Sequence, residues 1–276
     1  MNRRLNASLI TTGLVLVASA SSLFAQPGPP PVPPLGLPPV PPGNPITEPK
    51  RVLGKILFWD EQLSSSNTVS CGTCHSPLSG GGDRRRGQID GPDNTLNTPD
   101  DIFASPGVIK SDPIGNYLPS AEFGFNKQVT GRAAPSALMG AYMISNFWDG
   151  RALATFTDPV SGAVVLNAGA SLESQSVGPP MSDVEMAHGS RNWAQLTEKL
   201  TNAKPLALAS NIPSDVQAAL ANNPTYPQLF VEAFNDGTIT PARIAMAIAT
   251  YERTLVPDQT PWDRFNAGET TALTPN

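Results

Sequence analysis

The residues that could do chemistry in this sequence are concentrated in one short segment, Cys71-Gly72-Thr73-Cys74-His75. Its two cysteines are the only ones among 276 residues, and a histidine follows them directly. In a C-x-x-C-H segment both thiols can form thioethers with the vinyl groups of haem, and the histidine reaches the iron from the same turn. We therefore predict one covalent haem c, attached through Cys71 and Cys74, with His75 as the metal ligand.

Three other kinds of site use closely spaced cysteines. A zinc site needs about four ligands, and beyond this segment His188 is the obvious further candidate. A redox-active C-x-x-C is typical of a βαβ context, for which this sequence gives no pattern. A disulfide between Cys71 and Cys74 would suit an exported protein. The spacing, together with the adjacent histidine, favours haem over all three.

The start of the sequence has the parts of a secretory signal. Arg3 and Arg4 precede an apolar run from Leu9 to Leu16, and small residues follow. We therefore predict a signal peptide over residues 1–25 and a periplasmic protein. Residues 26–46 are rich in proline, which favours extended, solvated polyproline II and predicts a linker. The formal net charge of -5 argues against nucleic-acid binding, which needs a basic patch.

The remaining residues, 47–276, have the spacing of amphipathic helices and no sustained strand pattern. Apolar residues recur at helical spacing in four stretches, which are 52–57, 193–200, 226–234 and 244–255. Thr47 and Thr240 precede two of these stretches as candidate caps. From Ser79 to Gly131 the sequence predicts loops, and so long a loop often surrounds a ligand. The predicted fold class is all-α, a cytochrome c-like haem domain with long loops.

Further blocks of sequence lie around the C-x-x-C-H segment in a fixed order. They are Leu53-Gly54-Lys55-Ile56-Leu57-Phe58-Trp59-Asp60, Gly131-Arg132-Ala133-Ala134-Pro135-Ser136, Asn146-Phe147-Trp148-Asp149-Gly150-Arg151-Ala152, the set Gln175, Pro179 and Glu185, and Ala247-Ile248-Ala249-Thr250-Tyr251-Glu252-Arg253-Thr254-Leu255. In this order they resemble the bacterial di-haem cytochrome c peroxidases and their methylamine-utilisation relatives. The resemblance covers roughly residues 47 to 276.

The resemblance implies that hydrogen peroxide is reduced to water with electrons from a small cytochrome c or a cupredoxin. Glu185 matches the carboxylate that moves a proton between the peroxide oxygens, which is general acid-base catalysis. Gln175 and Pro179 match residues that line the same pocket. Trp148 matches an electron relay between two haems, and a homodimer is a further expectation for such a protein.

The residue types alone allow plainer interpretations of the same positions. A glutamate such as Glu185 is most often solvated, and Trp148 would most often serve packing. His188 would most often lie at the surface. The run Arg84-Arg85-Arg86 is typical of a solvated loop, although guanidinium groups also suit the carboxylates of haem propionates.

The sequence departs from the family pattern in several places. It holds one C-x-x-C-H where the family has two, so we expect one haem and a truncated sequence, with a true mono-haem protein as the alternative. Residues 125–132 lack the histidine that closes the distal side of the iron in some members, which predicts an open iron. Met139 replaces a calcium-binding asparagine and offers no hard oxygen ligand. Residues 158–172 look inserted between Trp148 and Gln175.

Two rival functions stay open at this point. A periplasmic electron-transfer cytochrome fills both axial positions of its iron, usually with His and Met, and Met181 and Met186 lie near Glu185 in the sequence. A maturation enzyme that oxidises a partner protein, as the methylamine-utilisation relatives do, is the other rival. An open iron with an acid beside it favours the peroxidase.

Overall fold

The computed structural model describes residues 35–274. Residues Leu35–Thr260 form one compact unit, and residues 261–274, with helix α8 (Pro261–Asn266), belong to a second. The predicted signal peptide and the first part of the predicted linker lie outside the described residues. No helix between residues 35 and 274 is long and apolar enough to cross a membrane.

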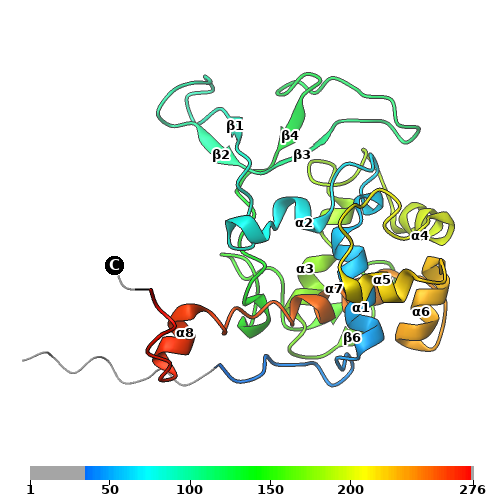
Figure 1. Ribbon diagram of the computed structural model, residues 1–276. Helices are drawn as coiled ribbons and strands as arrows, with labels where there is room; N and C mark the ends of the chain where they lie inside the picture. Colours follow the sequence, from blue (N-terminus) through cyan, green and yellow to red (C-terminus); the bar gives the residue numbers. More distant parts are fainter. Residues whose placement is uncertain (1–34, 275–276) are drawn as a thin grey trace, which may run out of the picture. The chain divides into compact units, whose positions relative to one another are not determined.

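Two helices, α1 (Glu48–Trp59) and α7 (Pro241–Glu252), pack against each other in the larger unit (Figure 1). They approach most closely at Gly54, where a Cβ atom would lie 1.8 Å from the carbonyl oxygen of Ala247. Ile56, two residues further along α1, is fully buried in the main hydrophobic core. Glycine is therefore needed at this contact, because any side chain would push the two helices apart.

Three more helices complete the helical part of the core. They are α4 (Trp193–Asn202), α5 (Ser214–Leu220) and α6 (Tyr226–Phe234). α5 and α6 contact α1, and α4 contacts α6. The helices predicted from apolar spacing are confirmed as α1, α4, α6 and α7. α5 was not predicted, because its single buried residue, Val216, leaves no apolar stripe to detect.

Polar side chains stabilise several helix starts. Asn192 accepts a hydrogen bond from the amide of Gln195 at 3.0 Å, and Thr240 accepts one from the amide of Arg243 at 3.2 Å. Each bond pairs a backbone N–H that the first turn leaves without a partner. Thr47 occupies the cap position of α1, as predicted, but its side chain makes no capping hydrogen bond.

The larger unit also contains three small antiparallel sheets, which the all-α prediction omitted. Each has two strands: β1 (Gly87–Ile89) with β2 (Ile102–Ala104), β3 (Pro106–Ile109) with β4 (Lys127–Val129), and β5 (Phe156–Thr157) with β6 (Val164–Leu166). Strands of two to four residues are too short to show an alternating pattern in the sequence. The described fold is therefore a helical core with small sheets, and the all-α class is not confirmed.

Short helices join these parts. They are η1 (Glu61–Leu63), α2 (Cys71–Cys74), η2 (Pro77–Ser79), η3 (Gly140–Tyr142), α3 (Ser171–Ser176) and η4 (Pro179–Met181). α2 lies against α1, and α3 lies against α7, β5 and η4. The segment with the two cysteines is thus attached directly to the central pair of long helices.

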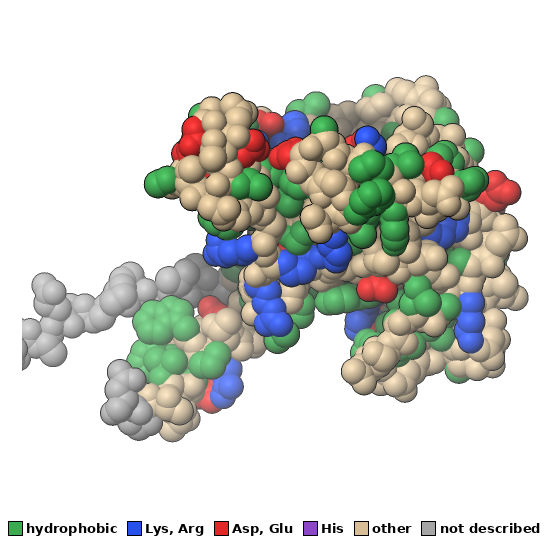
Figure 2. Space-filling view, turned by 90° about the horizontal axis from the view of Figure 1, so that it is seen from above, with side chains coloured by type: hydrophobic (Ala, Val, Ile, Leu, Met, Phe, Trp, Pro, Cys, Tyr) green, Lys and Arg blue, Asp and Glu red, His purple; other side chains and the backbone are tan. Residues whose placement is uncertain are grey.

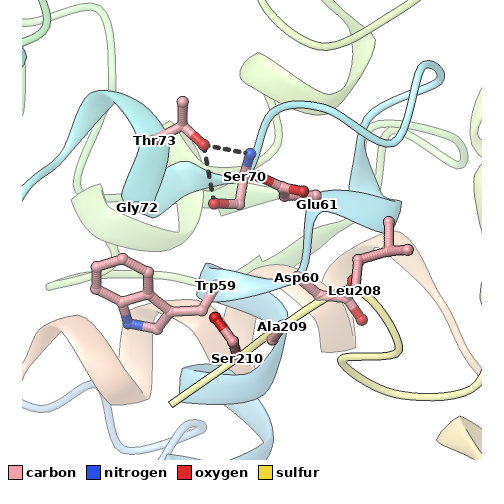
Figure 3. A pocket seen from close by; sticks show the side chains of 9 residues that line it. All are labelled: Trp59, Asp60, Glu61, Ser70, Gly72, Thr73, Leu208, Ala209 and Ser210. Carbon is pink, nitrogen blue, oxygen red and sulfur yellow. Dashed lines mark hydrogen bonds between the residues drawn. The ribbon is translucent and has the colours of Figure 1, made fainter. Parts of the chain in front are cut away.

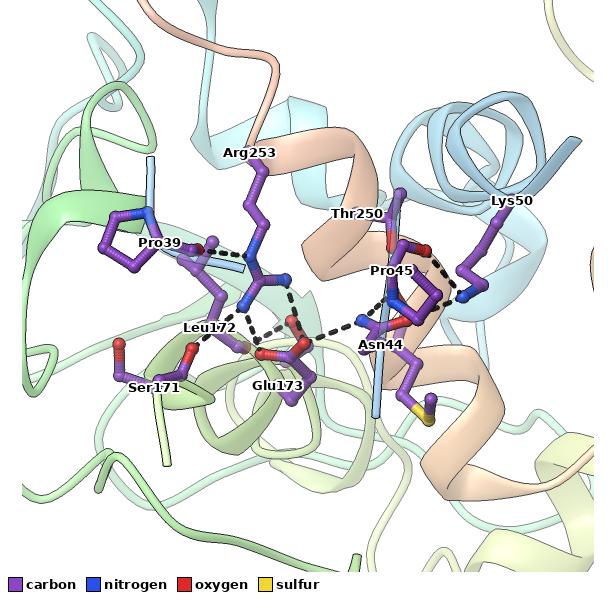
Figure 4. A network of polar contacts seen from close by, with 12 residues as sticks. Pro39, Asn44, Pro45, Lys50, Ser171, Leu172, Glu173, Thr250 and Arg253 are labelled. Carbon is purple, nitrogen blue, oxygen red and sulfur yellow. Dashed lines mark hydrogen bonds and ion pairs between the residues drawn. The ribbon is translucent and has the colours of Figure 1, made fainter. Parts of the chain in front are cut away.

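A buried ionic network connects α3, α7 and the end of the proline-rich segment (Figure 4). Arg253 makes two contacts of 2.8 Å with the carboxylate of Glu173, and neither side chain is more than 1% exposed. Asn44 donates to Glu173 at 2.7 Å, and Lys50 donates to Asn44 at 2.9 Å. The last residues of the predicted linker therefore belong to the folded unit, where a solvated spacer was expected.

The loop between β3 and β4 contributes little to the core. Ile114, Tyr117 and Phe125 in this loop all have exposed side chains. Viewed from above, the molecule shows hydrophobic side chains at its surface beside Lys and Arg side chains (Figure 2). The two strands that flank this loop form hydrogen bonds to the backbone of Asp183 and Val184.

Candidate haem-binding site

Helix α2 holds both cysteines, with Cys71 at its start and Cys74 at its end. Its first turn is closed by Ser70 and Thr73, because the amide of Ser70 donates to the Thr73 hydroxyl at 2.9 Å. Gly72 lies against the ring of Trp59, where a Cβ atom would come within 2.4 Å of the indole carbons. The glycine thus lets α2 lie flat on the end of α1.

A cavity of about 250 Å³ opens beside this contact (Figure 3). It is lined by side chains and backbone from the end of α1, from α2 and from the segment before α5, which are Trp59, Asp60, Glu61, Ser70, Gly72, Thr73, Leu208, Ala209 and Ser210. Neither cysteine lines it. The cavity therefore lies on the face of α2 formed by Gly72 and Thr73.

His75 follows α2 directly, and its ring is hydrogen-bonded to the backbone. Its Nδ1 lies 3.1 Å from the carbonyl oxygen of Gly81. A carbonyl oxygen only accepts, so Nδ1 carries the proton and the lone pair belongs to Nε2. Burial lowers the pKa of His75, opposed by hydrogen bonds to the carbonyls of Gly81 and Pro135. A neutral imidazole with a lone pair on Nε2 is the form that ligates iron.

The two thiols are free and half-buried, and the structure has no disulfide between them. Burial raises the pKa of Cys71 far above its usual value and that of Cys74 to about 11. Both side chains are therefore neutral thiols at neutral pH. Two free thiols on one helical turn, followed by an oriented imidazole, match the donor set of haem c.

Glu185 is brought to the same place from a distant part of the chain. Its half-buried carboxyl follows η4 in the sequence, and burial raises the pKa of this group, opposed by the charge of Arg151. Burial is the main cause of the raised pKa values of Cys71 and Cys74, and the negative charge of Glu185 makes a smaller contribution in the same direction. The half-buried Glu185 is therefore near enough to the two cysteines for its charge to act on both thiols. Glu185 is half-buried, which differs from the solvated position that its residue type alone suggests.

The β3–β4 hairpin holds the Glu185 loop in position. The amide of Val108 donates to the carbonyl of Val184 at 3.0 Å, and Gln128 donates to the carbonyl of Asp183 at 2.7 Å. A Cβ atom on Gly107 would lie 1.9 Å from the Val184 carbonyl oxygen. Sequence reasoning missed this support. Gly107 lay in a predicted loop, and only the long-range contact gives it a role.

The other predicted site residues are less closely connected. Gln175 lies in the last turn of α3, and Pro179 begins η4, so both belong to the segment that leads to Glu185. Trp148 is 72% exposed, and the guanidinium of Arg132 lies 4.5 Å from the centre of its ring. The structure thus does not bury Trp148 in the core, and its relay role stays a prediction.

Three more predicted positions have clear places. Met186 is buried in the main core, with Met181 packed against the same cluster. His188 is 7% exposed, and its Nδ1 donates to the carbonyl of Gly189 at 2.8 Å. The interpretation of His188 as a surface residue is therefore wrong, because it is a core histidine with a backbone partner.

The family model of the di-haem cytochrome c peroxidases matches residues 48–271. The methylamine utilization protein MauG of Methylophilus methylotrophus is 27% identical over 85% of this chain and 48% of its own length. Cytochrome c peroxidase Ccp of Escherichia coli K12 is 25% identical over 86% and 35%, and cytochrome c551 peroxidase of Pseudomonas aeruginosa is 27% identical over 84% and 46%. The chain thus spans half or less of the length of these relatives.

Two solved structures resemble the chain at low identity. A MauG-like protein associated with microbial copper homeostasis has a TM-score of 0.49 and 22% identity, and covers 89% of this chain and 50% of its own. The diheme peroxidase BthA of Burkholderia thailandensis E264 has a TM-score of 0.46 and 20% identity, over 84% and 45%.

Proposed function

Because the chain belongs to the di-haem cytochrome c peroxidase family, we propose that it forms the haem domain in which such a protein reduces hydrogen peroxide to water. The observation that carries this proposal is the position of Glu185. Its half-buried carboxyl has a pKa raised by burial, and its charge acts on both thiols of the segment that would bind haem c, which supports the proposal. The substrate, the electron donor and the single haem per chain all belong to the proposal.

Each residue of the site has a proposed task. Cys71 and Cys74 would form the two thioethers, and Nε2 of His75 would ligate the iron. When bound, haem c would pass to peroxide the two electrons that its reduction needs, and a small cytochrome c or a cupredoxin would supply both. Glu185 would be the acid-base group, and Gln175 and Pro179 would line the peroxide pocket.

Glu185 would move one proton. In the overall reaction, one hydrogen peroxide, two electrons and two protons give two waters. The carboxylate would take the proton from one peroxide oxygen and deliver it to the other, which leaves as the first water when the O–O bond breaks. The remaining oxygen would become the second water with the two electrons from the donor and two protons from solvent. Burial suits Glu185 to this task, because a raised pKa brings the carboxyl closer to the pH at which it must both accept and donate.

A peroxide turnover assay on the haem-loaded protein tests the proposal. Reduced small cytochrome c is supplied as the donor, and peroxide loss and cytochrome oxidation are followed together. We expect two cytochromes to be oxidised for each peroxide consumed. Haem-loaded protein that leaves peroxide and donor unchanged would contradict the peroxidase and favour an electron-transfer cytochrome. We also propose export through the N-terminal signal to the periplasm, where a covalent haem would be attached.

A second function is favoured by one observation, the 27% identity to methylamine utilization protein MauG over 85% of the chain. In that case the oxidising equivalents of peroxide would pass to a partner protein. The same assay separates the two functions. Peroxide loss that needs a reduced cytochrome supports the peroxidase, and peroxide loss with oxidation of an added protein and no cytochrome supports the alternative.

A further inference from the structure

Arg85 lies directly at the second cysteine of the site. Its Nη2 is 3.1 Å from Sγ of Cys74. The same guanidinium donates two hydrogen bonds to the carboxylate of Asp83, from Nε to Oδ1 at 3.0 Å and from Nη2 to Oδ2 at 2.7 Å. The backbone amide of Arg85 also donates to Oδ1 at 2.8 Å. Three hydrogen bonds to one carboxylate therefore fix the direction in which Arg85 points.

The burial of this pair separates Arg85 from its two neighbours. The Asp83 side chain is 1% exposed and that of Arg85 is 28% exposed, whereas Arg84 and Arg86 are exposed. The pKa of Asp83 is raised by burial, but the hydrogen bonds and charge of Arg85 outweigh this and hold it below its usual value. Both groups thus keep their charges. The expectation of a solvated loop is wrong for Arg85.

Although the Arg85–Asp83 ion pair has no net charge, the electrostatic effects of its two members do not cancel at Cys74. The guanidinium touches the sulfur, while the carboxylate lies behind it, so the positive charge is the nearer one. An exposed, unanchored arginine would be screened by water and salt. Arg85 is anchored and partly shielded, so its charge acts over a short and fixed distance.

We propose that Arg85, held by Asp83, is a positioning residue that presents a fixed positive charge to the haem edge at Cys74 and raises the reduction potential of that haem. This inference rests on the proposed haem site. Reduction adds an electron, so a nearby cation stabilises the reduced haem relative to the oxidised one. Charge and hydrogen bonding around a haem are established means of tuning its potential. In a peroxidase, this would set how readily the donor reduces the haem.

The test is a spectroelectrochemical titration of the exported, haem-loaded chain and its Arg85→Gln variant. We expect the variant to have a ratio of reduced to oxidised haem at least threefold lower at the same applied potential. For a one-electron couple at 59 mV per tenfold change, this is a decrease on the order of 30 mV. Arg84→Gln and Arg86→Gln remove the same charge from adjacent, exposed positions and are expected to shift the ratio by less than half as much. An unchanged potential in Arg85→Gln, or equal shifts in all three variants, would overturn the proposal.

Two further measurements distinguish a failure of the Arg85 proposal from a failure of the proposed haem site. Asp83→Asn keeps one acceptor oxygen for the backbone amide and Nε of Arg85 and removes the opposing charge, so the potential is expected to rise. A fall or no change counts against the proposal even if Arg85→Gln does not fold. Haem that stays with the wild-type chain in a denaturing gel establishes the site itself. A wild-type chain without covalent haem contradicts the proposed function and the inference together, whereas covalent haem with an unchanged Arg85→Gln potential contradicts the inference alone.

Discussion

Replacing Glu173 with glutamine is expected to destabilise the protein strongly. The carboxylate meets the guanidinium of Arg253 through two contacts of 2.8 Å, and both side chains are 1% exposed or less. The variant would leave a guanidinium buried without a counter-charge. Removal of one partner of such a buried pair typically costs about 3–5 kcal/mol. For a unit of this size each kcal/mol shifts the melting temperature by about 2–4 °C, so we expect a decrease of roughly 6–20 °C.

Thermal unfolding followed by circular dichroism measures this shift. Glu48→Gln is the matched control, because Glu48 pairs with Arg51 while 68% of its side chain is exposed. An exposed pair of this kind contributes about 0–1 kcal/mol. A decrease for Glu173→Gln no larger than that of the control would refute the reasoning. Adding Arg253→Met to Glu173→Gln should recover part of the loss, because it removes the uncompensated charge.

Three more predictions follow from individual contacts. Burial raises the pKa of Glu252 to about 8, so the folded chain keeps a proton that the unfolded chain loses near pH 4.5. The free energy of unfolding should therefore decrease as the pH rises from 4.5 to 8, by up to about 1.4 kcal/mol per pH unit. Denaturant titrations of Glu252→Gln should lack this pH dependence. Gly107→Ala should displace the Glu185 loop and slow the reaction with peroxide roughly 10- to 100-fold in rapid-mixing experiments at unchanged haem content, whereas Gly131→Ala, which meets open space, should not. A Cys71→Ala, Cys74→Ala double variant should lose all haem in a denaturing gel, and haem retained there would refute the attachment site.

Local patterns in the sequence were enough to predict the long helices. α1, α4, α6 and α7 each bury one face, so their apolar residues recur at helical spacing. The small sheets could not be predicted in the same way, because their strands have two to four residues and pair only within their own hairpins. Burial of Asn44 was also unpredictable, since its partner Glu173 lies 129 residues further along the chain.

The candidate site likewise contains residues that local sequence could predict and residues that depend on long-range contacts. Cys71, Cys74 and His75 are neighbours in the sequence, so their spacing alone indicated the chemistry. Glu185 was assigned through the family resemblance, and the structure brings its charge to both thiols. Arg85 had no distinguishing signal within a run of three arginines. Its role depends on which of the three side chains turns inward, and that is decided by the buried carboxylate of Asp83.

The most direct test of the central claim is the reaction of peroxide with haem-loaded Glu185→Gln in a stopped-flow spectrometer. The substitution keeps the shape of the side chain and removes its ability to carry a proton, and the measurement needs no partner protein. Glu198→Gln, on an exposed position of α4, is the matched control. We predict that haem content and the ferric spectrum stay unchanged, while the reaction slows by about 100- to 10,000-fold relative to the wild type and the control. A Glu185→Gln variant that reacts as fast as the wild type would contradict the account.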